Sequence, residues 1–194
     1  MKEFIASELR KTAAIVARVI ADGEIAPLVE AIVRRCVEAL RAERKILFAG
    51  NGGSAADAQH LASELVGRLA FDRPGLAALA LTSDASVLTA IGNDYGYERV
   101  FARQIDGVGQ RGDVFFGIST SGRSANVLNA LGECRRKGIV TVGLTGQGGG
   151  DMVALCDHCI RIPATETPKV QEGHIVVGHI ICALIEREMF GRRP

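Results

Sequence analysis

The sequence predicts an α/β fold in which a parallel β-sheet carries helices on both of its faces. Apolar runs of about four to six residues alternate with stretches of helical periodicity along the 194 residues. Such runs are typical of parallel strands that are buried on both sides. Gly is abundant at 23 residues, as expected of a fold with many tight strand-to-helix turns. Because no linker or low-complexity segment interrupts the pattern, we expect one domain over residues 1–194.

Residues 1–43 are expected to form a pair of helices. Apolar residues recur at helical spacing over 4–20 and again over 28–40, and Asp22-Gly23 breaks the pattern between them. A pair of this length exceeds what a sheet covered on both faces requires. We therefore predict that residues 1–43 serve in oligomerisation. The alternative is that they only cover the core of their own chain.

Five apolar runs are the predicted strands. They lie at residues 46–49, 76–81, 114–118, 140–144 and 159–162, and helices are expected to end near 66 and 137 and to span about 170–189. Open sheets of this kind bind ligands at the carboxyl ends of their strands. Two loops rich in glycine and serine, 50–54 and 119–124, fall at such ends.

Charge and cysteine content exclude several classes of protein. Lys and Arg number 23 against 22 Asp and Glu, so that no global field attracts nucleic acid or an anionic membrane. Five Cys residues are an odd number, which favours reduced thiols over a disulfide framework. The N-terminus is a poor signal peptide, and no run approaches the ~18 apolar residues that span a bilayer. We therefore expect a cytoplasmic protein without a nucleic-acid or membrane partner.

The two loops are candidate phosphate sites. Gly50-Asn51-Gly52-Gly53-Ser54 leads into a helix whose first N–H groups would be unpaired, but it matches neither a nucleotide P-loop nor a dinucleotide fingerprint. Residues 119–124, Ser-Thr-Ser-Gly-Arg-Ser, carry four hydroxyls within six residues. This density favours a phosphate monoester, and the alternative is ordinary helix N-capping by one or two of the serines.

Ile118–Ser124 resembles the phosphosugar-binding loop of SIS (sugar isomerase) domains, and Asn51–Ser54 resembles their first sugar-contacting loop. Together with Gly92–Gly96 and Gln171–His174, the sequence is similar to one branch of that family, the phosphoheptose isomerases. The resemblance covers nearly the whole chain. It implies a single SIS domain with a parallel, flavodoxin-like sheet of five strands, assembled as a homotetramer.

Four residues are candidate metal ligands. His60 and Glu64 are four residues apart on a predicted helix, and Gln171 and His179 are eight apart on another, so each pair shares roughly one helix face. From spacing alone, a chance surface or core pair explains His60 and Glu64 better. The resemblance implies instead that His60, Glu64, Gln171 and His179 bind one Zn²⁺ per subunit.

The resemblance also implies the catalytic and substrate-binding residues. Glu64 and His179 would be the acid–base pair. The implied substrate contacts are Asn51, Gly52, Gly53, Ser54, Glu64, Asn93, Asp94, Ser119, Thr120, Ser121, Ser124 and Gln171. Asn93 and Asp94 are equally explained by a Gly-Asn-Asp turn. One departure stands out, because some family members carry an acidic residue where this chain has Pro168, followed by Lys169.

Two minor candidates remain. Cys156 and Cys159 have metal-like spacing, but no second pair accompanies them. His174 either supports the Gln171 turn or occupies a plain helical position.

The resemblance implies an isomerase that converts sedoheptulose 7-phosphate to D-glycero-D-manno-heptose 7-phosphate through an enediol. This is the first step of nucleotide-activated heptose synthesis for lipopolysaccharide or capsule. The alternative is a non-catalytic SIS protein that binds phosphosugars or regulates the initiation of replication. Such a regulator would keep the hydroxyl-rich loop but need not keep the four candidate ligands together.

Overall fold

The computed structural model describes residues 1–191, which contain one sheet of five parallel strands. The strands are β1 (Ile46–Gly50), β2 (Ala78–Ala80), β3 (Val114–Ile118), β4 (Val140–Gly146) and β5 (His158–Ile162). Their order across the sheet is β2-β1-β3-β4-β5, so that β1 pairs with both β2 and β3. This is the flavodoxin-like order, and it confirms the predicted α/β class.

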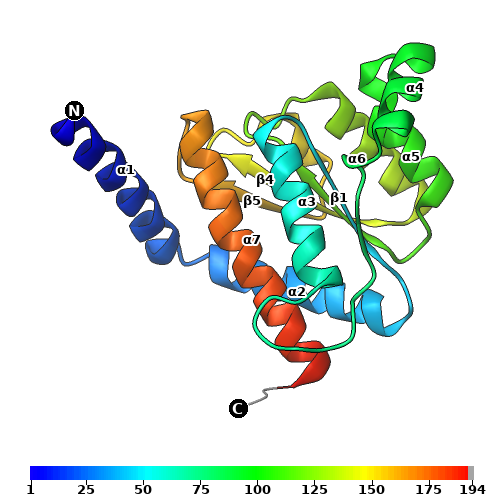
Figure 1. Ribbon diagram of the computed structural model, residues 1–194, viewed down its shortest axis with the longest axis horizontal. Coiled ribbons are helices and arrows are strands. Elements are labelled where there is room, and N and C mark those ends of the chain that lie inside the picture. The colour runs from blue at the N-terminus through cyan, green and yellow to red at the C-terminus, as the bar shows by residue number, and fades with distance from the viewer. Residues whose placement is uncertain (192–194) are drawn as a thin grey trace.

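Helices cover both faces of the sheet (Figure 1). They are α1 (Lys2–Ala21), α2 (Ile25–Arg41), α3 (Gly53–Val66), α4 (Ala85–Tyr95), α5 (Val100–Val108), α6 (Ala125–Lys137) and α7 (Thr167–Phe190), with two short 3₁₀ segments, η1 (Tyr97–Arg99) and η2 (Gly150–Ala154). Helices α2, α3 and α7 share one core with the sheet, and α5 and α6 share the other.

The alternation of strand side chains creates these two cores. Ile46 and Phe48 of β1 face α2, α3 and α7, whereas Leu47 and Ala49 join the core under α5 and α6. All five residues of β1 are buried, as are all five of β3. The centre of the sheet is therefore anchored on both sides, and the loops that leave the carboxyl ends of β1 and β3 start from rigid positions.

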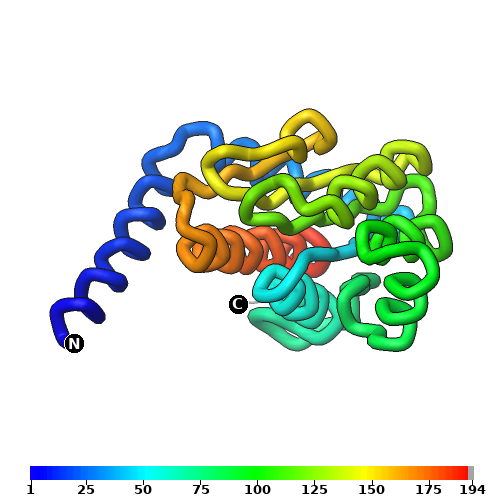
Figure 2. Tube along the Cα trace, turned by 90° about the horizontal axis from the view of Figure 1, so that it is seen from above, coloured from blue at the N-terminus to red at the C-terminus, as the bar shows by residue number. Residues whose placement is uncertain are grey.

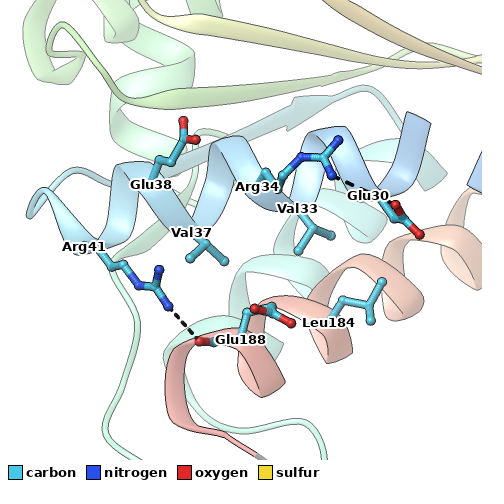
Figure 3. A pocket seen from close by; sticks show the side chains of 8 residues that line it. All are labelled: Glu30, Val33, Arg34, Val37, Glu38, Arg41, Leu184 and Glu188. Atoms are coloured by element: carbon cyan, nitrogen blue, oxygen red, sulfur yellow. Dashed lines mark hydrogen bonds and ion pairs between the residues drawn. The ribbon is translucent and has the colours of Figure 1, made fainter. Parts of the chain in front are cut away.

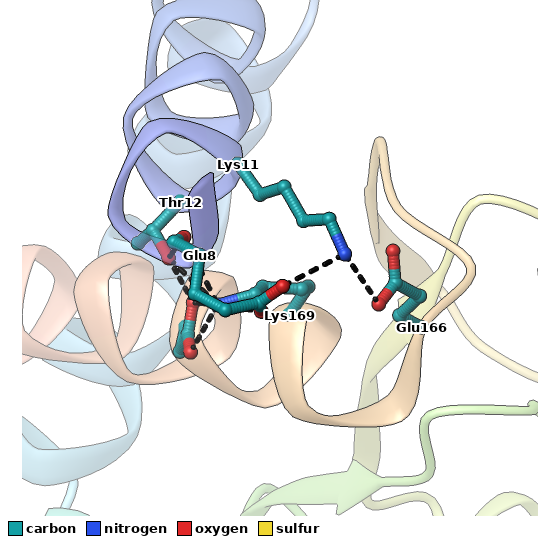
Figure 4. Close-up of polar contacts among 6 residues, drawn as sticks. Glu8, Lys11, Thr12, Glu166 and Lys169 are labelled. Atoms are coloured by element: carbon teal, nitrogen blue, oxygen red, sulfur yellow. Dashed lines mark hydrogen bonds and ion pairs between the residues drawn. The ribbon is translucent and has the colours of Figure 1, made fainter. Parts of the chain in front are cut away.

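Helix α1 projects from the body of the molecule (Figures 1 and 2). Polar contacts tie it to the start of α7, as Figure 4 shows: Thr12 Oγ1 donates to Glu172 Oε2 at 2.6 Å, and Lys169 Nζ donates to Thr12 Oγ1 at 3.0 Å. Lys169 also pairs with Glu172 at 2.9 Å, and Pro168 lies in the first turn of α7. Pro168 and Lys169 therefore form a helix start and a contact with α1.

A groove of about 470 Å³ lies between α2 and α7 (Figure 3). Val33 and Val37 form part of its floor, and Arg41 donates a hydrogen bond to the carbonyl oxygen of Glu188 at 3.0 Å. The groove lies against the middle and end of α2, away from the two glycine- and serine-rich loops.

The predicted elements agree with observed ones, but α4, α5, η1 and η2 had no counterpart in the sequence prediction. Strand β2 is shorter than the predicted run over 76–81, and β4 extends two residues beyond the predicted 140–144. The predicted break at Asp22-Gly23 separates α1 from α2. Within residues 1–191, none of the helices has the length and apolarity that a membrane crossing would require.

Candidate active site

The two glycine- and serine-rich loops lie side by side at the carboxyl edge of the sheet. Residues 50–54 follow β1 and residues 119–124 follow β3, and these strands are neighbours. The chain leaves β1 toward α3 on one face and leaves β3 toward α6 on the other, so the loops flank the point where the strand order reverses. In sheets of this class, that point is the usual ligand-binding crevice.

An amide pair joins the two loops. Asn51 Nδ2 donates to Asn126 Oδ1 at 2.9 Å, and Asn126 Nδ2 donates to Asn51 Oδ1 at 2.8 Å. Tyr97 Oη donates to the same Asn51 oxygen at 3.2 Å and thereby brings η1 to this edge. The predicted substrate contact Asn51 is thus oriented by Asn126 and Tyr97, which the sequence prediction did not include.

The helices that follow the loops keep their N-termini free of side-chain caps. Neither Gly52 before α3 nor Ser124 before α6 makes a side-chain capping bond. Ser124 Oγ instead lies 2.8 Å from Ser119 Oγ, and Ser121 Oγ accepts from the Arg123 amide at 3.2 Å. The amides of Ser54, Ala55 and Val127 donate to backbone carbonyl oxygens, whereas those of Gly53, Ala125 and Asn126 have no acceptor among the described residues and remain available to an anion. This observation favours phosphate binding over the capping alternative.

The structure brings His60, Glu64 and His179 together. His60 Nε2 lies 2.8 Å from His179 Nε2 and 3.3 Å from Glu64 Oε1, and the imidazole rings meet edge to face at 75°. One ligand atom from each residue lies within 4.8 Å of those of the others. Two imidazole nitrogens and one carboxylate oxygen are the donor set of many catalytic zinc sites, so these three residues fit a zinc ion.

Asp57 lies one turn before His60 and belongs to the same surroundings. Burial raises the pKa of its carboxyl group, and the neighbouring His60 and His179 oppose that shift. Its Oδ2 is buried and has no hydrogen-bond partner among the described residues. The sequence prediction missed Asp57, although the spacing of Asp57, His60 and Glu64 places all three on one face of α3.

Gln171 contacts the start of α3 in this structure. Its Nε2 is 3.5 Å from Ser54 Oγ, and a Cβ added to Gly53 would lie 2.6 Å from the same nitrogen. Eight residues of helix separate Gln171 from His179, a rise of about 12 Å along α7. The side chain therefore packs over the start of α3, where the absence of a side chain at position 53 makes room for it.

Asn93 and Asp94 lie in the last turn of α4, so the Gly-Asn-Asp turn weighed from the sequence is wrong. Both are exposed, and Asn93 Nδ2 donates to Asp94 Oδ1 at 2.8 Å. The chain then continues through Gly96, at φ +85°, to Tyr97 beside Asn51. Asn93 and Asp94 thus precede Tyr97, whose hydroxyl contacts the first loop, by four and three residues.

The minor candidates lie elsewhere. Cys156 and Cys159 flank the space over Gly143 of β4, and His174 is buried against the sheet with a pKa lowered to about 4 by burial. Neither ring nitrogen of His174 has a partner in the described part of the chain. His174 is therefore neutral at physiological pH and sits in the core.

The matched family model gives the class of this protein. The model of the SIS domain matches residues 9–146. The chain therefore belongs to the SIS domain family, as the two loops had indicated.

Comparison with individual relatives assigns the chain to a narrower group within the SIS family. Phosphoheptose isomerase from Aneurinibacillus thermoaerophilus is 54% identical over 190 residues, which are 98% of this chain and 96% of that protein. The solved phosphoheptose isomerases from Neisseria gonorrhoeae (38% identity, TM-score 0.89, 95% and 98% of the two chains) and Francisella tularensis (31%, 0.91, 95% and 97%) share the fold. Within the SIS family, the chain falls in the phosphoheptose isomerase branch and is an enzyme of the isomerase class. The predicted family and enzyme class are confirmed.

Proposed function

We propose that the protein converts sedoheptulose 7-phosphate to D-glycero-D-manno-heptose 7-phosphate. The two loops at the ends of β1 and β3 hold the phosphate through the amides of Gly53, Ala125 and Asn126 at the starts of α3 and α6 and through the hydroxyls of residues 119–124. His60 lies two helical turns along α3 from Gly53, about 10 Å away. An extended seven-carbon chain anchored by its phosphate can place its carbonyl end near the His60, Glu64 and His179 group.

The reaction is a pair of proton transfers. One group removes a proton from C1 of the ketose and delivers a proton to C2, and another moves protons on and off the oxygens at C1 and C2, with an enediol between the steps. We assign these tasks to Glu64 and His179, which come from α3 and α7 and lie in one group with His60. Gly53, Ser54 and Gln171 line the start of α3 and orient the substrate.

We propose one Zn²⁺ per subunit, held by His60, Glu64 and His179. The ion would stabilise negative charge on the enediol oxygens. Gln171 stays a predicted fourth ligand, and its amide contacts Ser54 in this structure. The single observation that carries the catalytic proposal is the short distance between the two imidazoles, because their helices are far apart in the sequence.

We also propose a cytoplasmic homotetramer built through residues 1–43. Large apolar side chains are exposed on α1, among them Phe4 at 69%, Leu9 at 66% and Ile20 at 79%. Exposed apolar side chains gathered on one projecting helix favour contact with another copy. The five cysteines are free, which fits a reducing compartment. The product would enter nucleotide-activated heptose synthesis for lipopolysaccharide or capsule.

The competing function is a non-catalytic phosphosugar-binding regulator. Such a protein needs the two loops but has no use for two imidazoles and a carboxylate gathered on α3 and α7. The His60, Glu64 and His179 group is therefore the feature that favours the enzyme.

Incubation with sedoheptulose 7-phosphate in deuterated water tests the proposal. We expect protein-dependent formation of the aldose, followed by nuclear magnetic resonance, with solvent deuterium entering at C2. A wild-type protein that gives no turnover with or without added Zn²⁺ contradicts the proposal and supports the regulator.

Metal content is measured on the same samples. We expect a stoichiometric metal in the wild type that is lost in the double variant His60→Ala/His179→Ala. Retention of the metal by that variant would remove the proposed ligand set.

Replacing Gly53 with alanine is expected to lower kcat/KM by about 10- to 100-fold, since a displaced substrate contact costs that much. The new Cβ would lie 2.6 Å from Gln171 Nε2, so the amide must leave its place beside Ser54. Gly132→Ala is the control, because this exposed α6 position has no atom within 4 Å of an added Cβ. The control should keep wild-type kinetics and gain about 0.5–1 kcal/mol of stability. Wild-type kcat/KM in Gly53→Ala would argue against a role for Gln171.

A further inference from the structure

Arg73 and Glu186 form an ion pair that is buried between the end of α3 and helix α7. Arg73 Nε lies 3.0 Å from Glu186 Oε1, and both side chains are 0% exposed. Arg73 belongs to the segment that connects α3 to β2, whereas Glu186 lies in the last two turns of α7. Burying two charges away from water costs free energy unless further hydrogen bonds satisfy them. The further bonds of this pair all lead to the end of α3 and the chain after it.

The Arg73 guanidinium closes the C-terminus of α3. It donates to the carbonyl oxygens of Glu64 at 2.8 Å and Leu65 at 2.6 Å, and also to those of Gly67 and Pro74. The last carbonyls of a helix have no partner within the helix, and a cation there is favourable. Helix α3 has no basic residue in its own last turn. Arg73 therefore supplies, from outside the helix, the positive charge and the donors that the last turn of α3 lacks.

Glu186 holds the chain that follows α3. Its Oε1 accepts from the Leu69 amide at 3.1 Å and its Oε2 from the Ala70 amide at 2.9 Å. Burial alone would raise the pKa of Glu186, but the amides of Ala70 and Leu69 and the Arg73 guanidinium outweigh it and hold the pKa below its ordinary value. Glu186 is therefore ionised at neutral pH, and one α7 carboxylate secures both Arg73 and the 69–70 segment.

We propose that Arg73 and Glu186 are positioning residues, which fix the last turn of α3 against α7 and thereby set the approach of Glu64 to His60 and His179. The inference rests on the proposed function, because it assigns the pair a part in the proposed metal and proton-transfer group. Neither residue touches that group directly.

The contacts along the two helices carry this inference. The carbonyl oxygen that Arg73 Nη2 binds is that of Glu64 itself. Glu186 follows His179 by seven residues, two turns of α7 on the same face. The two helices touch at Leu61, beside His60: a Cβ on Gly178 would lie 2.7 Å from Leu61 Cδ2, and Cys182 Sγ lies 3.8 Å from the Leu61 carbonyl oxygen. A shift of the α3 end is thus transmitted over a single turn to Glu64 and His60.

A second buried carboxylate provides a matched control. Asp113 Oδ2 lies 2.8 Å from Lys45 Nζ, its side chain is 0% exposed, and it accepts from the amides of Lys45 and Gln110. Lys45 and Asp113 immediately precede β1 and β3, at the opposite edge of the sheet from the two loops. Asp113→Asn therefore removes a comparable charge with comparable partners, far from the His60, Glu64 and His179 group.

The test compares Arg73→Lys, Glu186→Gln, the double variant Arg73→Met/Glu186→Leu and Asp113→Asn with the wild-type protein. The unfolding temperature of each variant is measured first. Zinc affinity, by competition with a chelating dye, and kcat and KM are then measured well below the lowest unfolding temperature. We expect Arg73→Lys and Glu186→Gln to lower zinc affinity by about 10- to 100-fold, the usual effect of losing groups that orient metal ligands. We expect kcat to fall with KM nearly unchanged, because other contacts hold the two loops.

The double variant separates positioning from stability. It leaves no unpaired buried charge, so its unfolding temperature should recover more than its zinc affinity. Asp113→Asn should lower the unfolding temperature and keep wild-type zinc affinity and kcat. Variants of Arg73 and Glu186 that lose stability as Asp113→Asn does, yet keep wild-type zinc affinity and kcat, would overturn the inference. If the wild-type protein binds zinc but does not isomerise the substrate, only the proposed function is refuted. The zinc affinities of the variants then still test the positioning role. A wild type that binds no zinc overturns both.

Discussion

Replacing Glu64 or His179 with glutamine is expected to lower kcat for the proposed isomerisation by about 10²- to 10⁴-fold, the usual contribution of one acid–base group. Glutamine keeps a polar side chain of similar reach but cannot exchange a proton at neutral pH. KM should change little, because the phosphate is proposed to bind at the loops after β1 and β3 and not at these two residues. Steady-state kinetics with sedoheptulose 7-phosphate gives both constants.

Matched variants and added zinc separate the roles of these two residues. Glu188→Gln, on the exposed end of α7, and His158→Gln, at the start of β5, make the same chemical changes outside the group and should keep wild-type kcat. Metal content should fall in Glu64→Gln and His179→Gln, since both residues are proposed ligands. If saturating zinc restores wild-type kcat to either variant, that residue acts as a ligand alone and its acid–base role is refuted.

Gly122→Ala is expected to raise KM for the phosphosugar by about 10- to 100-fold, because it displaces the loop proposed to hold the phosphate. Gly122 lies at φ +65°, and an added Cβ would be only 1.9 Å from the Gly149 carbonyl oxygen. The Gly122 carbonyl also accepts from the Met152 amide at 3.2 Å, so the loop and η2 must move together. The strained backbone should cost about 1–3 kcal/mol of stability as well.

Inhibition by inorganic phosphate tests the same change with a second ligand. We expect phosphate to inhibit the wild type competitively and to inhibit Gly122→Ala more weakly. Gly148→Ala is the control in the neighbouring loop, because an added Cβ there meets no atom within 4 Å and the residue has no left-handed backbone. Gly122→Ala with wild-type KM and wild-type inhibition by phosphate would show that residues 119–124 do not hold the phosphate.

Local sequence patterns predicted most of the elements and missed those that lack such a pattern. The central strands β1, β3 and β4 could be predicted because the sheet buries nearly all of their residues, whereas the edge strands β2 and β5 are only partly buried. Helix α4 fully buries none of its residues, and its apolar face is short because only Leu88 and Ile91 pack against the core. The Asp84 cap, which accepts from the Val87 amide, marks its start. Helix α5 has nine residues, too few to display a clear period.

The residues of the candidate site also fall into those that local sequence predicts and those that only the structure reveals. Residues 50–54 and 119–124 could be placed together from the sequence, because the carboxyl ends of parallel strands meet at one edge. Asn126 and Tyr97, which orient Asn51, could not be found, since their role depends on contacts across 75 and 46 residues of sequence. Asp57 was within reach, because it shares a helix face with His60 and Glu64.

The sequence by itself determined the α/β class, the family and the two loops at the sheet edge, because these follow from periodicity and from motifs within a few residues. Only the tertiary structure decided that His60 and Glu64 meet His179, that Gln171 lies over Gly53, and that Arg73 reaches Glu186. Each of these contacts joins α7 to α3 or to the segment after it, more than 100 residues earlier in the chain. The packing of two helices on one sheet face fixes such contacts, and local spacing carries no information about it.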